Sequence, residues 1–277
     1  MKTPPRHELP SSRESFADSI ESDAAELELE LGGPTWDAEW MPSFHRTALN
    51  HSAIRAYVNP ADPGIAHALE LVACAAAAAH AAALTPGTDP IKAPAPGGRQ
   101  VDVVRTARPR ELQPASQWRT GVLAAVVSRN ADALHMLTAM RPEDLLRISR
   151  NPPPAWFDVE TRALSCLFRR EVDAADRLLE AVQLAGSERM DQDWPRDIVA
   201  PELELGARAL QSDVEKFDVA MLHALERHHE YYAGDGKDDF LGQLALAPLA
   251  IAAFAHDLGL ITGVESDYTP RWLIERI

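Results

Sequence analysis

Residues 248–258 read PLAIAAFAHDL, and Gly259 follows them. Proline fits the first turn of a helix, where its missing N–H costs no hydrogen bond, and glycine readily adopts the left-handed backbone that ends many helices. The apolar residues between them cover most of the helix circumference instead of one stripe. This stretch therefore predicts a central helix that is buried on nearly all sides, with Pro248, Leu249 and Phe254 in the core.

Helical signals recur through the rest of the chain, where apolar residues repeat at helical spacing between proline and glycine breaks. Long helices joined by short turns predict an all-α fold, either an irregular helical bundle or a short solenoid of paired antiparallel helices. No strict repeat period is visible, so no repeat family is assigned. The predicted helices cover residues 43–58, 63–84, 114–129, 131–140, 142–150, 155–170, 172–184, 197–210, 213–232 and a last one that Thr269 caps and Pro270 opens.

Two short segments are candidates for β-structure. Residues 26–31 read ELELEL, and this strict alternation favours an edge strand, although its dense charge fits a loose, solvated arm equally well. Residues 100–104 read QVDVV and form the other strand candidate, after a proline- and glycine-rich loop over 85–98. The sequence therefore predicts at most a small β accessory.

The first 40 residues differ in composition from the rest, with ten acidic side chains against three basic ones. Gly32, Gly33 and Pro34 then interrupt the chain, as expected between two structural elements. We predict an acidic, partly flexible arm over residues 1–40 and a single helical domain over residues 41–277.

The net charge of the chain is −15, from 27 basic and 42 acidic residues. Such a chain repels phosphate backbones, which argues against direct nucleic-acid binding. The same charge favours association with a basic protein partner, because opposite potentials raise the encounter rate. A surplus of acidic residues is also common among soluble proteins.

The remaining composition points to the cytoplasm and away from a membrane. Cys74 and Cys166 lie in apolar helical patterns, which predicts buried thiols and no disulfide framework. The first 16 residues lack the apolar core of a secretory signal. The most apolar run, residues 69–84, is interrupted by His80 and is too short to cross a bilayer core of about 30 Å.

The motifs of common enzymes are missing from the sequence. It contains no GxxxxGK[ST] phosphate loop, no GxGxxG after a strand, no HExxH and no cysteine–histidine metal set. His256 and Asp257 are adjacent, but no serine or cysteine nucleophile in a suitable context accompanies them. We therefore predict no catalytic residue, no metal and no cofactor, and a protein that is not an enzyme.

The helix predicted over residues 213–232 carries the densest group of titratable side chains. Its apolar positions, among them Phe217 and Leu225, define a buried face, with His228 and His229 at its two borders with solvent and Glu226 and Glu230 pointing outward. One interpretation is a metal or acid–base site formed by His229 and the two glutamates. The favoured interpretation is that both histidines donate hydrogen bonds to neighbouring carboxylates or carbonyls.

The loop after this helix and the tail of the chain are also acidic. The loop lacks the ligand spacing of a calcium site, and Asp239 is expected to cap the segment that begins at Phe240. In the tail, Tyr268 and Trp272 are expected to pack the C-terminus onto the core, whereas the carboxylates of Glu265 and Asp267 either belong to that lock or face a basic partner.

Two of these segments, residues 225–232 and 246–272, resemble the immunity 49 family. The resemblance consists of a His-x-Glu-Tyr-aromatic element, an apolar PLALA-like helix, an acidic turn and a Glu-Ser-Asp-Tyr-x-Pro tail. Phe254 and Leu258 depart from the family pattern, and the acidic arm is an extension. The matching positions are His228, Glu230, Tyr231, Tyr232, Pro248, Leu249, Ala250, Ala252, His256, Asp257, Gly259, Glu265, Ser266, Asp267, Tyr268 and Pro270.

The resemblance implies a bacterial antidote that binds and neutralises a cognate polymorphic toxin, here expected to be basic and hypothetically a nuclease or nucleic-acid deaminase. The hypothetical toxin-binding residues are His229, Glu226, Glu230, Tyr231, Asp235, Asp238, Asp239, Glu265 and Asp267. The expected structural core comprises Phe217, Leu225, Pro248, Leu249, Phe254, Tyr268 and Trp272.

Two other functions fit the same residues. The first is a helical scaffold that binds a protein partner other than a toxin. The second, ranked last, is a helical hydrolase that uses Asp235, Asp238, Asp239 and His229 with a metal. The sequence specifies neither the toxin nor the oligomeric state.

Overall fold

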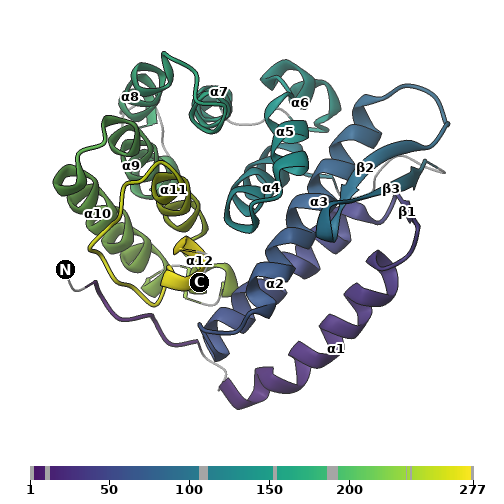
Figure 1. Ribbon diagram of the computed structural model, residues 1–277, viewed down its shortest axis with the longest axis horizontal. Helices are drawn as coiled ribbons and strands as arrows, with labels where there is room; N and C mark the ends of the chain where they lie inside the picture. The colour runs from purple at the N-terminus through teal and green to yellow at the C-terminus, as the bar shows by residue number, and fades with distance from the viewer. Residues whose placement is uncertain are drawn as a thin grey trace. The chain divides into compact units, whose positions relative to one another are not determined.

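The computed structural model describes residues 3–9, 13–105, 112–151, 155–185, 193–234, 236–237 and 239–275 (Figure 1). Its contacts divide the chain into two compact units. The N-terminal unit comprises Ser11–Pro153, and the C-terminal unit comprises Pro154–Ile277 together with Met1–Pro10. The predicted arm is therefore divided between the two units, while the single domain over residues 41–277 stays a prediction.

The described part of the N-terminal unit contains six α-helices and a three-stranded sheet. In the sheet, β3 lies in the middle, parallel to β1 and antiparallel to β2. The elements are α1 (Arg13–Leu31), β1 (Thr35–Asp37), α2 (Met41–Val58), α3 (Gly64–Leu84), β2 (Ile91–Ala95), β3 (Arg99–Val104), α4 (Pro114–Ser128), α5 (Ala131–Thr138) and α6 (Pro142–Ile148).

Helix α3 forms the core of this unit, packed against α2 and α4. Its alanines 75–79 are completely buried, because side chains this small let neighbouring helices approach closely. Where α4 passes α3, a Cβ added to Gly121 would lie 2.4 Å from the Cβ of Ala76. Buried polar side chains of this core form hydrogen bonds to backbone carbonyls. Trp118 Nε1 donates to the Leu137 carbonyl, and the two ring nitrogens of His80 contact the Ala76 and Pro114 carbonyls.

Among the described residues, two segments are long and apolar enough to cross a membrane, Gly64–Leu84 and Phe240–Asp257. The expectation that the first is too short was wrong, because α3 extends the apolar run to 21 residues. Most of each segment is nevertheless covered by protein, with 78% and 72% of the tested windows buried. Core helices pass the same test of length and composition, and burial of this extent is what a core helix shows.

The described helices of the C-terminal unit all lie in residues 155–275, whereas its N-terminal segment, residues 3–9, is not helical. Its elements are α7 (Ala155–Phe168), α8 (Ala174–Ala185), a π-helical turn (Pro195–Val199), α9 (Ala200–Gln211), α10 (Val214–Ala233), a 3₁₀ turn (Phe240–Gln243), α11 (Leu246–Asp257) and α12 (Arg271–Glu275). Helix α11 packs against α9, α10 and α12, and residues 247–255 are all buried. The predicted central helix is therefore confirmed, and Gly259 ends it with a φ of 89°.

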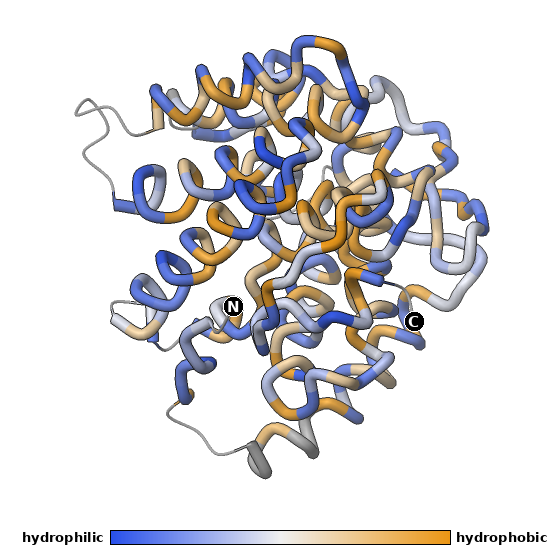
Figure 2. Tube along the Cα trace, turned by 60° about the vertical axis from the view of Figure 1, so that its left-hand side comes forward, coloured by the Kyte–Doolittle hydropathy of each residue, from blue (hydrophilic) through white to orange (hydrophobic). Residues whose placement is uncertain are grey.

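The all-α prediction is confirmed, and in Figure 2 most helices carry both hydrophobic and hydrophilic residues around each turn. The strand predicted over residues 26–31 was wrong, because these residues end α1. A glutamate–leucine alternation also places leucines four residues apart, which lie on one helix face. Leu27 and Leu31 are accordingly buried, whereas Leu29 between them is 79% exposed.

The strand over residues 100–104 is confirmed as part of β3, but its partner β2 was predicted as a loop. Pro94 lies within β2, and proline is tolerated in strands mainly at sheet edges. The strand order β1–β3–β2 places β2 at such an edge.

Candidate functional site

Tyr268 lies at the centre of a buried polar cluster in the C-terminal unit. Its side chain is fully buried in the loop before α12, and its backbone carbonyl accepts a hydrogen bond from Ala245 N at the start of α11. The hydroxyl contacts the backbone N of His7 at 2.9 Å, His7 Nδ1 at 3.1 Å and His229 Nδ1 at 3.0 Å. Burial raises the pKa of this phenol, so it stays protonated at neutral pH.

The hydrogen-bond directions in this cluster follow from Gln243. Its amide nitrogen donates to His7 Nε2 at 2.7 Å, so the proton of the neutral imidazole is on Nδ1. His7 Nδ1–H then donates to the Tyr268 hydroxyl, which in turn donates to His229 Nδ1. Burial and the nearby His229 and Arg6 lower the pKa of His7 to about 4. The result is a chain of hydrogen bonds from Gln243 through His7 and Tyr268 to His229.

His228 belongs to the same cluster but has a different partner. Its Nε2 donates to the Gly242 carbonyl at 2.8 Å, and its ring lies 4.6 Å from Tyr232 and 5.0 Å from Tyr268, centroid to centroid. Burial lowers the pKa of His228 to about 4. The prediction that His228 lies at the border with solvent was wrong, because the 3₁₀ turn over Phe240–Gln243 covers it. Its hydrogen bond to a carbonyl is the favoured arrangement.

Residues 3–9 run along the tail that contains Tyr268. Thr3 Oγ1 donates to the Glu265 carbonyl at 3.1 Å, and the guanidinium of Arg6 donates to the Asp267 carbonyl. Arg6 also lies over the Tyr268 ring, 5.9 Å from its centroid. Arg6, His7 and Leu9 are all buried. The N-terminal segment is thus an integral part of this cluster.

Some of the carboxylates predicted to face a partner form ion pairs within the chain, and others do not. Glu230 pairs with Arg227, which also pairs with Asp197, and Glu265 pairs with Arg271 at 3.1 Å. Glu226 and Asp267 are exposed and have no cationic partner among the described residues.

Most of the other predicted toxin-binding residues that the structure describes contact neighbouring residues of the chain itself. His229 is half-buried on the Tyr268 hydroxyl, and Tyr231 packs edge-on against Trp194 at 5.3 Å. Asp239 accepts a hydrogen bond from Leu241 N at 2.9 Å, which confirms the predicted cap. Asp235 and Asp238 lie outside the described residues. The structure therefore leaves the metal interpretation of His229, Glu226 and Glu230 without a shared site, because Glu230 and His229 have separate partners.

The residues expected in the core lie mostly inside the C-terminal unit. Phe254 packs edge-on against Phe168 at 5.5 Å, and Trp272 is only half-buried. The predicted cap by Thr269 was wrong, because its buried hydroxyl has no hydrogen-bond partner among the described residues and α12 begins at Arg271. Phe217, Leu225, Pro248, Leu249 and Tyr268 are buried.

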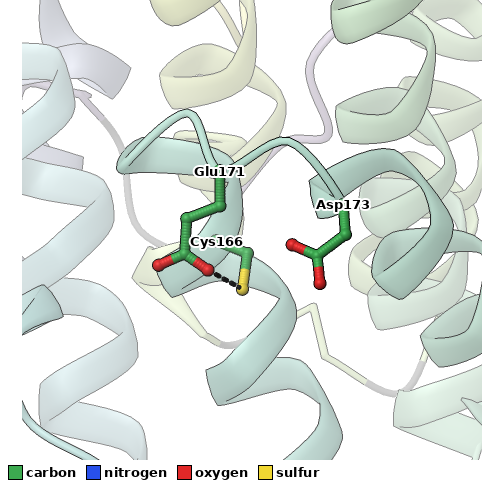
Figure 3. A group of neighbouring side chains, drawn as sticks. All are labelled: Cys166, Glu171 and Asp173. Atoms are coloured by element: carbon green, nitrogen blue, oxygen red, sulfur yellow. Dashed lines mark hydrogen bonds between the residues drawn. The ribbon is translucent and has the colours of Figure 1, made fainter.

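One group of metal-ligand type, Cys166, Glu171 and Asp173, occurs in the described residues (Figure 3). The thiol donates to Glu171 Oε2 at 3.0 Å, and burial raises the pKa of Cys166 to about 11. Both carboxylates already have cationic partners, Arg169 for Glu171 and Arg177 for Asp173. A protonated thiol and two carboxylates that already pair with arginines are better suited to stabilising the turn between α7 and α8 than to binding a metal.

Arg6, His7 and Gln243 were missed as site residues. His7 contacts Tyr268 from 261 positions away, Arg6 lies over the same ring, and Gln243 joins the cluster by contacting His7 from 236 positions away. A local sequence pattern does not predict contacts over such separations. Only the adjacent Arg6 and His7 in an otherwise acidic segment distinguished that region.

A family model described as Immunity protein 49 matches residues 62–273 of the chain. No curated protein and no solved structure matches it. The matched region contains α10, α11 and the tail with Tyr268, whereas residues 3–9 lie outside it.

Proposed function

The chain belongs to the Immunity protein 49 family and is thus an immunity protein, and from this premise we propose that it binds a cognate bacterial toxin and neutralises it without catalysis. The family match carries the proposal, since it covers the chain from α3 to the first residues of α12. Neutralisation then consists of covering the active or substrate-binding surface of the toxin. The cytoplasm is the compartment in which this antidote would meet a toxin before export.

The charge of the chain supports a basic partner. With a net charge of −15, it attracts positively charged surfaces and repels polyanions. Toxins that act on nucleic acid need positive surface to hold phosphates, and an acidic protein can occupy that surface in place of the substrate. A nuclease or a nucleic-acid deaminase is therefore the proposed target class.

Co-expression with the toxin encoded beside this gene tests the proposal. The chain should restore growth and should form a stable complex in which toxin activity disappears at equimolar concentration. Failure to bind or silence any neighbouring toxin would reject the antidote function. If growth is restored but the silenced toxin leaves nucleic acid intact, only the proposed target class fails.

The scaffold alternative makes a different prediction in the same experiment. A scaffold should capture a host protein from cells that lack the toxin gene, and should leave the toxin active. An antidote should show neither property.

A further inference from the structure

The outward face of α10 carries a continuous stripe of exposed residues. At about 100° per residue, the side chains of Glu215, His223, Glu226 and Glu230 lie within about 40° of Val219 around the helix axis. All five are exposed, and Val219 is 64% exposed although it is apolar. A large exposed aliphatic residue in the middle of a charged stripe is a candidate contact point.

The stripe borders a depression between α9 and α10. This depression has a volume of ≈ 460 Å³, and Val219 and Ala220 supply its apolar part. Glu204 and Arg208 of α9 line the other side and pair with each other at 3.0 Å. A side chain from a partner could enter here without breaking a core contact, because the depression is open to solvent.

Charge is distributed unevenly along the stripe. Glu230 pairs with Arg227, which it shares with Asp197, and Lys216 beside Glu215 pairs with Asp213 at 2.9 Å. Glu215 and Glu226, in contrast, have no cationic partner among the described residues. These two free carboxylates lie on the N-terminal and C-terminal sides of Val219, so the stripe offers an apolar centre between two uncompensated negative charges.

Helix α10 is also held firmly on both flanks of the stripe. On one flank, Arg227 pairs with Asp197 of the π-helical turn. On the other, Asp218 accepts hydrogen bonds from Thr262 Oγ1 at 2.6 Å and from Gly263 N. A rigid surface loses little conformational entropy on binding, which favours affinity.

We propose that this stripe, with the depression beside it, is the surface that contacts the toxin. The partner is a basic protein surface that places an apolar side chain over Val219 and Ala220 and basic side chains against Glu215 and Glu226. This inference rests on the proposed function and places the centre of the interface at Val219, about two and a half to three helical turns before the His228–Glu230 region.

Two substitutions in the full-length chain test the surface, each with a matched control. Val219→Arg should weaken toxin binding by about 30-fold or more, because it fills the depression and adds repulsive charge. Glu226→Lys should weaken it by about 10-fold at low salt and less at high salt, since the lost attraction is screened. The controls are Val172→Arg and Glu180→Lys, which change exposed residues of the same types elsewhere in the C-terminal unit.

Affinity is measured by calorimetry, and folding of each variant by circular dichroism. Wild-type affinity in both folded stripe variants, or equal losses in the two controls, would overturn the proposed surface while toxin neutralisation by the wild-type chain keeps the proposed function intact. If Val219→Arg changes the oligomeric state of the free chain and leaves toxin affinity unchanged, the stripe is a self-association surface and the proposal is also overturned. An inactive wild-type chain would instead reject the function itself.

Discussion

The cores of the two units are stabilised by different interactions. In the N-terminal unit, the alanines of α3 allow helices to approach until little space remains, as at Gly121 and Ala76. In the C-terminal unit, α11 is equally buried, but a cluster of polar rings around Tyr268 lies beside it. Steric fit thus defines the first core, and directed hydrogen bonds add to packing in the second. The consequence is that the two units should fail under different kinds of change.

The largest loss of unfolding free energy is expected from a charged substitution in the core of the C-terminal unit. Phe254→Asp removes the ring that packs against Phe168 and under the Arg170 guanidinium, and puts a carboxylate in its place. The lost packing and the burial of charge should together cost more than about 4 kcal/mol of unfolding free energy. Hydrogen exchange should show lost protection over residues 155–275. The conservative change Phe254→Leu serves as control and should keep protection. A protected Phe254→Asp variant would show that this core tolerates charge.

A single methyl group should be almost as harmful in the N-terminal unit. Gly121→Ala would bring two Cβ atoms to 2.4 Å unless the helices separate, so we expect a loss of about 3 kcal/mol in denaturant unfolding. Adding Ala76→Gly removes the opposing methyl and should recover part of the loss, as a double-mutant cycle would show. Strictly additive effects would mean that the close approach of α3 and α4 does not limit stability.

Lowering the pH should strongly reduce the unfolding free energy through the buried histidines around Tyr268. His228 has a pKa of about 4 in the folded protein and 6.5 ordinarily, so between these values the unfolded chain binds a proton that the folded chain does not. The unfolding free energy is therefore highest above pH 6.5, falls as the pH drops towards 4, and loses up to about 3 kcal/mol through this residue. His7, His229 and Arg6 face the same cluster and add to the cost of a positive charge there.

Urea unfolding at several pH values between 7 and 4 measures this dependence. His228→Gln keeps a donor for the Gly242 carbonyl but cannot titrate, so its slope in this window should be shallower than that of the wild-type chain. Identical slopes would show that His228 takes up a proton as readily in the folded protein as in the unfolded chain.

Removal of the Tyr268 hydroxyl should lower the unfolding free energy by a moderate amount. Tyr268→Phe keeps the buried ring but leaves the His7 backbone N–H without its acceptor, which should cost about 2 kcal/mol. The loss should be smaller once residues 3–9 are deleted, because those donors are then absent. An equal loss with and without the segment would contradict the assigned network.

How much of this could be predicted from sequence depends on the range of each interaction. The helix over residues 248–258 and the cap by Asp239 depend on neighbours within a few positions, and both were predicted. Alternation over residues 26–31 fits a strand and a helix alike, and only the burial of Leu27 and Leu31 selects the helix. The contact of His7 with Tyr268 spans 261 positions, and β2 depends on a sheet edge that tolerates Pro94, so neither leaves a local signal.

The smallest expected change in stability comes from Glu230 on α10, and it tests whether a carboxylate with a cationic partner contributes less to toxin binding than one without. Glu230 pairs with Arg227 three residues earlier, at an exposed position, and such pairs contribute less than about 1 kcal/mol. Glu230→Gln should change the unfolding free energy by less than about 0.5 kcal/mol. It should also weaken toxin binding less than Glu226→Gln does, because Arg227 already compensates Glu230, whereas Glu226 has no cationic partner among the described residues. If Glu230→Gln proves the more damaging change, Arg227 turns away from Glu230 in the complex, and the centre of the interface moves towards the His228–Glu230 region and Tyr268.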